Sequence, residues 1–373
     1  MEKKSLKVIV SGGGTGGHIF PAVSIANALR EINPEVDILF VGAEGRMEME
    51  KVPAAGYRIV GLPVVGLQRK LTLKNVSFIP KLLKSIRLAS VIVKEFKPDV
   101  VVGVGGYASG PILRVAQRKD IPTLIQEQNS YAGITNRLLA KKAKAICVAY
   151  EGMDKYFPAE RLVITGNPVR QGLDSIMPKA KEALDFFEIP TNSRVILVVG
   201  GSLGARTINQ SILADVDRFE EQKDTFLIWQ TGKLYYHDIK AELDAKKFES
   251  IRLFDFINRM DFAYSAADLV ISRAGACTIS ELCLLGKPAI LVPSPNVAED
   301  HQTKNAKALV RREAAELITD FDAPTKLIGK AIELISSLEE LNKLSINVKK
   351  LALPNSAVSI AKKVVEIAIN NKA

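Results

Sequence analysis

The chain has 373 residues, of which 47% are hydrophobic and 25% charged, and its mean hydropathy is +0.10. This length predicts two domains at about 150 residues each, and the composition excludes a disordered chain. The three cysteines form neither an even set nor a C-x-x-C pair, so we expect no disulfide framework, no zinc site and a reducing compartment. No apolar stretch is long enough to predict a signal peptide or a membrane span.

The net charge of +10 is unevenly distributed. Residues 1–168 hold 24 Lys and Arg against 14 Asp and Glu, whereas residues 169–373 hold 27 of each. The basic excess of the first half predicts an anionic partner. Charge alone leaves open whether that partner is a nucleic acid, an anionic lipid or a phosphorylated substrate.

Short apolar, β-branched runs alternate with helical patterns and predict parallel strands covered by helices on both faces. In the first half the predicted strands are Lys7–Val10, Asp37–Val41, Arg58–Val60, Val100–Val104, Thr123–Ile125, Ala145–Val148 and Leu162–Ile164. In the second half they are Val195–Val199, Phe226–Trp229, Ile251–Phe254, Leu269–Ile271, Ala289–Val292 and Glu316–Ile318. The chain is therefore predicted to contain two doubly wound α/β domains.

A helix-disfavouring break at Asn167-Pro168 separates the two series of strands, so we expect a hinge near Thr165–Arg170. The predicted domains are residues 1–168 and 169–355. The segment Ser356–Ile369 predicts a terminal amphipathic helix that packs back on one domain. The apolar residues expected on its buried face are Val358, Ala361, Val365 and Ile369.

A glycine run follows the first predicted strand and precedes a helix predicted from Pro21 to Leu29. Glycine lets the backbone approach a ligand, and a helix N-terminus offers N–H groups to an anion. The spacing Gly12-x-Gly14-x-x-Gly17 also matches a dinucleotide-binding fingerprint, with Glu44 as a candidate ribose ligand. The other local interpretation is a tight turn that needs small residues.

The second half repeats the device with Gly200–Arg206 after a strand. Ser202 in this loop is a candidate phosphate ligand or helix N-cap. Glu281 is predicted in the first turn of a later helix, where it either complements the helix dipole or accepts hydrogen bonds from a ribose diol. His301 and Gln302 place polar groups at another corner between a strand and a helix.

Seven motifs occur together along the chain. They are Gly13–His18 with Pro21, Gly103–Pro111, Glu127–Asn129, Gly166–Arg170, Gly200–Arg206, Gly275–Glu281 and His301-Gln302. Their order and spacing resemble the MurG family of peptidoglycan glycosyltransferases over nearly the whole chain. The resemblance implies a GT-B fold, in which two Rossmann-like domains face an interdomain cleft and the C-terminal helix, residues 356–373, returns to the first domain.

The same resemblance implies the reaction. Members of this family are inverting transferases that move GlcNAc from UDP-GlcNAc to the C4 hydroxyl of MurNAc in undecaprenyl-pyrophosphoryl-MurNAc-pentapeptide. That acceptor is lipid I, and the product is lipid II of peptidoglycan synthesis. We therefore expect a role in cell-wall biogenesis, cell shape and cell division.

The C-terminal domain is expected to bind the donor. The resemblance implies that Glu281 holds the ribose hydroxyls and that Ser202 and Arg170 face the diphosphate. Ile257 is expected to meet the uracil through its backbone, and Gln302 to orient the sugar hydroxyls with His301 beside it. The other donor contacts that the family implies are Thr15, Gly16, Gly17, Asn129, Ala276, Cys277 and Thr278. Cys277 stands where a leucine-like residue is expected, and we interpret it as a small hydrophobic residue.

The N-terminal domain is expected to face the acceptor with His18, Tyr107 and Asn129. His18 is the candidate general base, because an unperturbed histidine titrates near neutrality and this one ends a glycine loop. Its other interpretation is a residue that packs or caps the helix start. The amides of Gly200–Ala205 with Arg170 are expected to stabilise the leaving diphosphate. No D-x-D motif is positioned as a metal bridge, so neither a metal nor another cofactor is expected.

The segment from Arg69 to Lys97 carries eight Lys and Arg against one acid, Glu95. Polybasic segments gain about 1 kcal/mol per charge near anionic bilayers, and interleaved apolar residues add to this. The expected membrane contacts are Leu73, Lys74, Val76, Phe78, Ile79, Lys81 and Lys84. We expect peripheral attachment to the cytoplasmic face of the bacterial plasma membrane. The alternative is a solvated basic helix with its apolar face in the core.

Three other classes compete with this interpretation. An NAD-linked oxidoreductase leaves the second glycine loop and the corner at Glu281 without a role. A UDP-GlcNAc epimerase shares the two-domain architecture but needs no membrane segment. A nucleic-acid binder explains the basic half, yet no such module is recognised and aromatic residues are only 6% of the chain. The expected partners are UDP-GlcNAc, lipid I, an anionic membrane surface and other cell-wall synthesis proteins, without nucleic acid.

Overall fold

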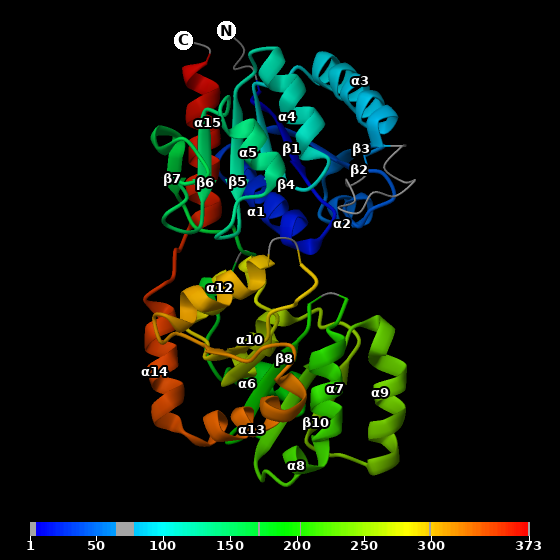
Figure 1. Cartoon of the computed structure of the whole chain (residues 1–373), viewed down its shortest axis with the longest axis vertical. Helices are drawn as coiled ribbons and strands as arrows, with labels where there is room; N and C mark the ends of the chain where they lie inside the picture. Colours follow the sequence, from blue (N-terminus) through cyan, green and yellow to red (C-terminus); the bar gives the residue numbers. More distant parts are fainter. Residues whose placement is uncertain (1–4, 65–77, 171, 202, 298–299, 372–373) are drawn as a thin grey trace. The chain divides into compact units, whose positions relative to one another are not determined.

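The computed structural model describes residues 5–64, 78–170, 172–201, 203–297 and 300–371, which form two units (Figure 1). Unit 1 comprises Met1–Arg170 and Asn355–Ala373, and unit 2 comprises Gln171–Pro354. Each unit has one sheet, and all of the recorded strand pairs are parallel. The predicted fold class, two parallel-sheet α/β domains, is confirmed.

In the described part of unit 1, seven strands follow the order β3-β2-β1-β4-β5-β6-β7. Their bounds are β1 (Lys7–Gly12), β2 (Asp37–Ala43), β3 (Arg58–Leu62), β4 (Val100–Gly105), β5 (Thr123–Glu127), β6 (Ala145–Val148) and β7 (Leu162–Ile164). The helices are α1 (Gly16–Ile32), α2 (Glu48–Ala54), α3 (Phe78–Phe96), α4 (Ser109–Arg118), α5 (Ile134–Ala140), α15 (Ser356–Asn370) and the short η2 (Ala159–Arg161). Every predicted strand is present, and the inner strands β1, β2, β4, β5 and β6 are almost fully buried, as their continuous apolar runs predict.

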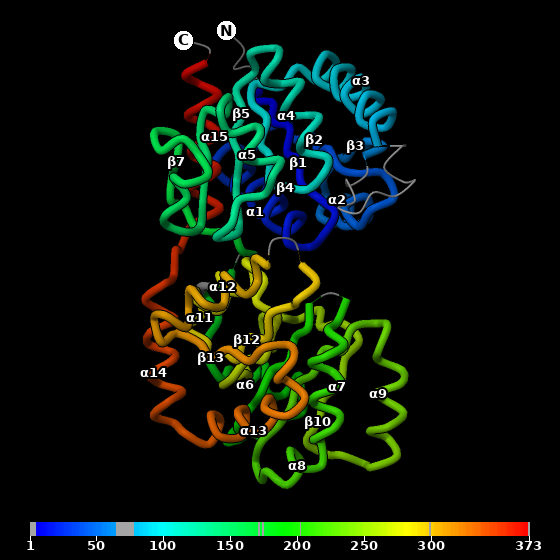
Figure 2. The backbone as a smooth tube through the Cα atoms, in the orientation of Figure 1, coloured from blue at the N-terminus to red at the C-terminus, as the bar shows by residue number. Residues whose placement is uncertain are grey.

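Alternate residues of β1 point to opposite faces of the sheet, as the strand geometry requires. Val8 and Val10 join a core with residues of α1 and α15, whereas Ile9 joins the core that includes residues of α3, α4 and α5. Figure 2 shows the red C-terminal helix beside the blue and green tube of the same unit. A segment that follows the whole of unit 2 in the chain therefore completes one layer of unit 1.

The buried face of α15 differs from the predicted one. Its buried apolar residues are Ile360, Ala361, Val364, Ile367 and Ala368, of which only Ala361 was expected. Val358 and Val365 are partly buried against the same core, and Ile369 is 61% exposed. Apolar residues occupy several sides of this helix, so periodicity alone allows more than one stripe, and the contact with α1 selects the one observed.

In the described part of unit 2, six strands follow the order β10-β9-β8-β11-β12-β13. Their bounds are β8 (Arg194–Val199), β9 (Thr225–Gln230), β10 (Ile251–Phe254), β11 (Leu269–Ser272), β12 (Ala289–Leu291) and β13 (Glu316–Leu317). The helices are α6 (Lys181–Phe186), α7 (Arg206–Ala214), α8 (Val216–Glu220), α9 (Lys233–Lys246), α10 (Met260–Ala266), α11 (Ala276–Leu285), α12 (His301–Val310), α13 (Ala323–Ser336), α14 (Leu338–Lys349) and the short η3 (Leu173–Ser175). Ile196 and Val198 of β8 pack in one core with apolar residues of α7 and α13.

Helix α3 has two different parts. Toward its C-terminal end, Ala89, Ile92 and Val93 are buried, whereas Ile79 and Leu83 near its start are 64% and 63% exposed. The expected membrane contacts Leu73, Lys74 and Val76 lie outside the described residues. Within the described ranges, no helix combines the length and the apolar character needed to cross a membrane.

Candidate functional site

The first glycine loop starts where β1 ends, and α1 begins at Gly16 rather than at the predicted Pro21. Thr15 is the N-cap residue in extended conformation, and its carbonyl accepts the His18 amide at 3.1 Å. Gly14 has a φ of +87°, a value that residues other than glycine rarely adopt. Extended Thr15 ends the loop, and Gly16 and Gly17 are already helical, so the predicted start at Pro21 is wrong.

His18 lies in the first turn of α1 and is half-buried. Its Nδ1 is 3.1 Å from the Gly13 carbonyl oxygen and 3.4 Å from Thr15 Oγ1. A Cβ at Gly105 would lie 2.9 Å from His18 Nε2, so the loop after β4 packs directly against the ring. When Nδ1 donates to the Gly13 carbonyl, the neutral ring carries its lone pair on Nε2, which is the nitrogen that can take a proton.

A buried carboxylate, which the sequence analysis did not single out, holds the other side of this loop. Glu48 is the first residue of α2 and is 0% exposed. Its Oε2 accepts the Gly14 amide at 2.9 Å and its Oε1 accepts the Ala43 amide at 2.9 Å. Glu44, the candidate ribose ligand of the dinucleotide interpretation, is exposed instead.

The loop after β5 is organised by a second buried carboxylate, Glu127. Its Oε1 accepts the Asn129 amide at 3.1 Å, and its Oε2 accepts the Gly133 amide at 3.0 Å and Asn136 Nδ2 at 2.9 Å. Gln128 Nε2 donates to the Val104 carbonyl at 2.6 Å, which ties this loop to β4. The structure therefore brings the loops after β1, β4 and β5 to one edge of the unit 1 sheet.

The expected acceptor-side residues all belong to these loops or follow them directly. Asn129 is half-buried and fixed by Glu127, whereas Tyr107 is 56% exposed. Gly17 is exposed and Gly16 half-buried at the start of α1. His18, Tyr107 and Asn129 thus share the carboxyl edge of one sheet, where open α/β folds bind ligands.

In unit 2 the second glycine loop follows β8, and α7 begins at Arg206. Gly201 and Gly204 have φ values of +95° and +78°. The buried Gln230, at the end of β9, donates from Nε2 to the Gly201 carbonyl at 3.0 Å. Its Oε1 accepts the Ile257 amide at 2.9 Å, so one neutral side chain positions both the loop and the residue expected at the uracil. Ser202 lies outside the described residues.

Glu281 is not in the first turn of its helix, because α11 begins at Ala276. The earlier start places the carboxylate in the second turn, so its interpretation as a partner of the helix dipole is wrong. Glu281 is buried, at 6% exposed, and its Oε2 accepts the Tyr264 hydroxyl at 2.8 Å. A buried, oriented carboxylate of this kind can accept hydrogen bonds from a diol.

Most of the remaining donor-site candidates lie at the carboxyl edge of the unit 2 sheet, and Arg170 belongs to unit 1. Ala276, Cys277 and Thr278 form the first turn of α11, and Cys277 and Thr278 are half-buried. Gln302, in the first turn of α12, accepts the Ser294 amide through Oε1 at 2.9 Å, next to a half-buried His301. Arg170 is exposed and closes the N-terminal segment of unit 1.

The two other cysteines differ from Cys277. Burial raises the pKa of the Cys147 thiol and of the Cys283 thiol to about 12. These thiols stay protonated and unreactive near neutral pH. None of the three cysteines forms a disulfide in the described ranges. Within the described ranges, no cluster of three His, Cys, Asp or Glu side chains has the arrangement that could hold a metal ion.

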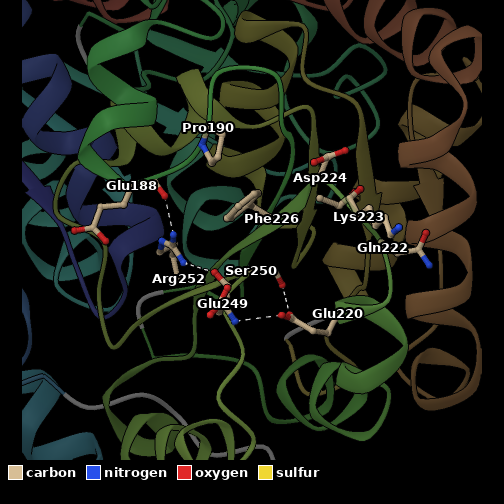
Figure 3. A pocket seen from close by; sticks show the side chains of 11 residues that line it. Glu188, Pro190, Glu220, Gln222, Lys223, Asp224, Phe226, Glu249, Ser250 and Arg252 are labelled. Atoms are coloured by element: carbon tan, nitrogen blue, oxygen red, sulfur yellow. Dashed lines mark hydrogen bonds between the residues drawn. The ribbon is translucent and has the colours of Figure 1, made fainter.

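A hollow of ≈ 690 Å³ in unit 2 contains none of these candidates (Figure 3). It lies at the amino ends of β9 and β10, the edge opposite the glycine loop. Arg252 there donates to the carbonyls of Glu188 at 2.6 Å and Glu249 at 2.7 Å, and Glu220 accepts the Glu249 amide at 3.1 Å. Since it lies at the edge opposite the glycine loop and no candidate residue lines it, this hollow is not the candidate site.

Two doubly wound units, each with a glycine loop at the carboxyl edge of its sheet, define the class of open α/β proteins that bind ligands at this edge. Comparison with known families identifies the family to which the chain belongs. Residues 8–148 match the glycosyltransferase family 28 N-terminal domain, and residues 195–363 match the family 28 C-terminal domain. The chain therefore belongs to glycosyltransferase family 28, and it is a glycosyltransferase.

Relatives of high identity share one name, UDP-N-acetylglucosamine--N-acetylmuramyl-(pentapeptide) pyrophosphoryl-undecaprenol N-acetylglucosamine transferase. The protein of Parabacteroides distasonis is 59% identical, with 98% of this chain and 99% of the relative covered. That of Bacteroides fragilis is 56% identical, with 98% and 96% covered. The expected family is confirmed, and the oxidoreductase and nucleic-acid-binding interpretations are wrong.

Solved structures also match nearly the whole chain. The MurG of Acinetobacter baumannii has a TM-score of 0.77 at 28% identity and covers 97% of this chain and 99% of its own. The UDP-GlcNAc 2-epimerase of Neisseria meningitidis, solved with UDP-GlcNAc bound, has a TM-score of 0.67 at 16% identity and covers 98% and 100%. At 16% identity the epimerase likeness shows a shared fold alone, so the epimerase alternative gains no support beyond architecture.

Proposed function

We propose that this chain transfers GlcNAc from UDP-GlcNAc to the C4 hydroxyl of MurNAc in undecaprenyl-pyrophosphoryl-MurNAc-pentapeptide, with inversion at the anomeric carbon. The observation that carries the proposal is 59% identity across 98% of the chain with a transferase named for this donor and acceptor. The roles proposed below are assigned to residues of the carboxyl-edge loops.

In the proposed mechanism His18 Nε2 takes the proton from the acceptor hydroxyl as its oxygen bonds to the anomeric carbon. The bond from that carbon to the β-phosphate oxygen breaks, and UDP leaves with the electron pair. The imidazole is the base because the Gly13 carbonyl accepts from Nδ1 and stabilises the protonated ring. Tyr107 and Asn129 are proposed to contact the acceptor.

Donor contacts are proposed for residues of unit 2 and for Thr15, Gly16, Gly17 and Asn129. Glu281 is proposed to accept from the ribose hydroxyls and Ile257 to bind uracil through its backbone, which Gln230 positions. Arg170, Ser202 and the loop amides are proposed to stabilise the leaving diphosphate. The proposed sugar contacts are Gln302, His301, Ala276, Cys277 and Thr278.

The test is transfer of radiolabelled GlcNAc from UDP-GlcNAc to a short-tailed lipid I analogue, with and without EDTA. We expect labelled disaccharide product under both conditions. Conversion of UDP-GlcNAc to another UDP-sugar without transfer would instead identify an epimerase. Label transfer that needs the phosphorylated acceptor, and fails with the free sugar, separates this acceptor from simpler ones.

We also propose that unit 1 binds the anionic cytoplasmic leaflet of the plasma membrane through the start of α3. Ile79 and Leu83 lie four residues apart and are 64% and 63% exposed, with Lys81 and Lys84 exposed around them. Phe78 is half-buried, so its contribution is expected to be smaller. Apolar side chains flanked by lysines are typical of segments that bind anionic interfaces.

Flotation with vesicles of phosphatidylglycerol and phosphatidylethanolamine tests this membrane contact. We expect Ile79→Ser with Leu83→Ser to reduce bound protein, and Val91→Ser on the same helix to leave it unchanged. Val91 is the matched control because it is also apolar and 43% exposed. Equal flotation of all variants would mean that α3 is a solvated helix.

A further inference from the structure

Glu48 and His18 contact the two ends of one peptide group. The Gly14 amide donates to Glu48 Oε2 at 2.9 Å, and the Gly13 carbonyl oxygen lies 3.1 Å from His18 Nδ1. The Gly13 carbonyl and the Gly14 amide belong to the same planar peptide unit, and in a trans peptide they point in opposite directions. The carboxylate and the imidazole are therefore linked through a single peptide group.

The backbone around this link is shaped to admit the carboxylate. A Cβ at Gly13 would lie 2.1 Å from Glu48 Oε1, and a Cβ at Gly42 would lie 2.6 Å from Glu48 Cγ. Both positions are glycine, so Glu48 lies directly on the backbone of the loop and of β2. Oε1 meanwhile accepts the Ala43 amide at 2.9 Å, which fixes the carboxylate against the end of β2.

Hydrogen bonds in such a chain polarise one another. A carboxylate that accepts from an amide N–H increases the negative charge on the carbonyl oxygen of that same peptide. Each hydrogen bond in such a chain is strengthened by about 10–30%. The carbonyl then accepts more strongly from His18 Nδ1. This bond holds the proton on Nδ1 in the neutral ring, and it favours the positively charged ring that forms when Nε2 takes a proton.

We propose that Glu48 is a positioning residue for His18, acting through the Gly13–Gly14 peptide to hold the ring in the Nδ1–H tautomer and to stabilise its protonated form. The proposal rests on the proposed role of His18 as the base. A residue that only fixes the loop would keep the Gly13 carbonyl beside His18 Nδ1 but would not strengthen that hydrogen bond through the shared peptide.

The test is Glu48→Gln, which keeps the size of the side chain. Its amide group can accept from one of the two backbone donors but faces the other with an N–H. We expect kcat for transfer to the lipid I analogue to fall about tenfold to hundredfold, since general-base catalysis contributes about 10²–10⁴ in total. KM for UDP-GlcNAc is expected to change less than about twofold, because uniform donor binding is retained.

The tautomer gives a readout that a purely structural role would not move. The chain has only three histidines, so ¹⁵N-histidine labelling gives few signals, and His18→Ala assigns the relevant pair. At about pH 8.5, above the ordinary histidine pKa of about 6.5, we expect the Nδ1–H form in the unmodified protein. In Glu48→Gln we expect the Nε2–H form, which histidine in water prefers, to increase.

Asp99→Asn is the matched control. Asp99 Oδ2 accepts the Lys7 amide at 2.8 Å at the amino edge of the same sheet, so this change weakens a similar bond far from the loop. We expect no change in kcat or in the His18 signals. Gly42→Ala is the second variant, because its Cβ displaces Glu48 without altering the carboxylate. If Glu48→Gln does not unfold cooperatively, the variant is not properly folded. The ¹⁵N signals of His18 in Gly42→Ala then test whether displacing Glu48 changes the tautomer.

Unchanged turnover, or lost turnover with an unchanged tautomer, would overturn the role of Glu48. A failure of the proposed function gives a different result. Normal transfer by His18→Ala would show that His18 is not the base. Lost transfer in His18→Ala together with normal Glu48→Gln overturns the positioning role alone.

Discussion

The glycine loops after β1 and β8 are both rich in glycine, but one contacts a charged side chain and the other a neutral one. In the first loop, the Gly14 amide donates to the buried Glu48 carboxylate. In the second, the Gly201 carbonyl accepts from the neutral carboxamide of Gln230. A phosphate group is repelled by a carboxylate in contact with its loop, whereas a neutral amide costs no such repulsion. The comparison indicates that a glycine run alone does not identify a phosphate-binding loop.

The two loops also differ in what their ends carry. The first leads into a helix whose third residue is His18, and its carbonyl at Gly13 bonds the ring. The second is wedged against Thr231 and Gly232, and a Cβ at Gly204 would lie 1.9 Å from the Thr231 carbonyl oxygen. We infer that the first loop serves proton transfer and the second serves the diphosphate.

The largest expected effect divides these two roles. His18→Ala should lower kcat about 10²–10⁴-fold, because it removes the proposed base, and should leave UDP affinity within about twofold. Transfer kinetics and calorimetric UDP titration measure the two quantities. His237→Ala, an exposed histidine of α9, is the control. A loss of UDP affinity with normal kcat would reverse the assignment of the loops.

Next in size is the carboxylate of unit 2. Glu281→Gln should weaken UDP binding about tenfold to hundredfold, since hydrogen bonds to a charged group contribute about 1.5–3 kcal/mol. Tyr264→Phe keeps the carboxylate and removes the hydroxyl that orients it, so its effect should be smaller. Calorimetry with UDP and with 2′,3′-dideoxy-UDP checks the cause, because the variant should no longer distinguish the two ligands.

Gln230→Glu makes the second loop resemble the first. The new carboxylate can still accept the Ile257 amide but places negative charge beside Gly201. We expect about tenfold weaker UDP binding from charge repulsion, with uridine binding nearly unchanged. Uridine is the internal control, because it lacks the phosphates. Equal weakening of both ligands would mean that the substitution had disturbed the uracil contact instead.

The smallest effect concerns Cys277. It is half-buried at the start of α11, whereas burial raises the pKa of Cys147 and Cys283 to about 12. A thiol reagent at neutral pH should therefore modify one cysteine, and UDP-GlcNAc should slow that reaction a few-fold. Peptide mapping identifies the residue, and Cys277→Ala should show no modification. Protection absent at saturating donor would place Cys277 outside the donor site.

The strands and their parallel arrangement were predictable, because runs such as Val100–Val104 are apolar on both faces and match the buried centre of a sheet. Helix starts were less so. The predicted start at Pro21 and the predicted first-turn position of Glu281 both lie later than the observed starts at Gly16 and Ala276, since glycine and small polar residues give weak helical signals. The face of α15 depended on its contact with α1, which no local pattern contains.

Glu48 was missed for a different reason. A glutamate at a helix start is usually a solvated partner of the helix dipole, and its burial depends on which loop folds over it. One local signal was present, because Gly42 interrupts the apolar run Asp37–Ala43, and glycine inside a strand often marks a close approach by another group. The sequence indicated that something lies against β2, but the partner became known only from the fold.

The return of α15 to unit 1 has a consequence for synthesis on the ribosome. When residue 170 has emerged, the apolar face of α1 that later contacts Ile360 and Val364 has no cover, because those residues are still untranslated. Unit 2, in contrast, is one continuous segment and can fold as soon as it leaves the exit tunnel. Unit 1 is therefore the last to complete its core. Deletion of α15 would leave the apolar face of α1 exposed to solvent.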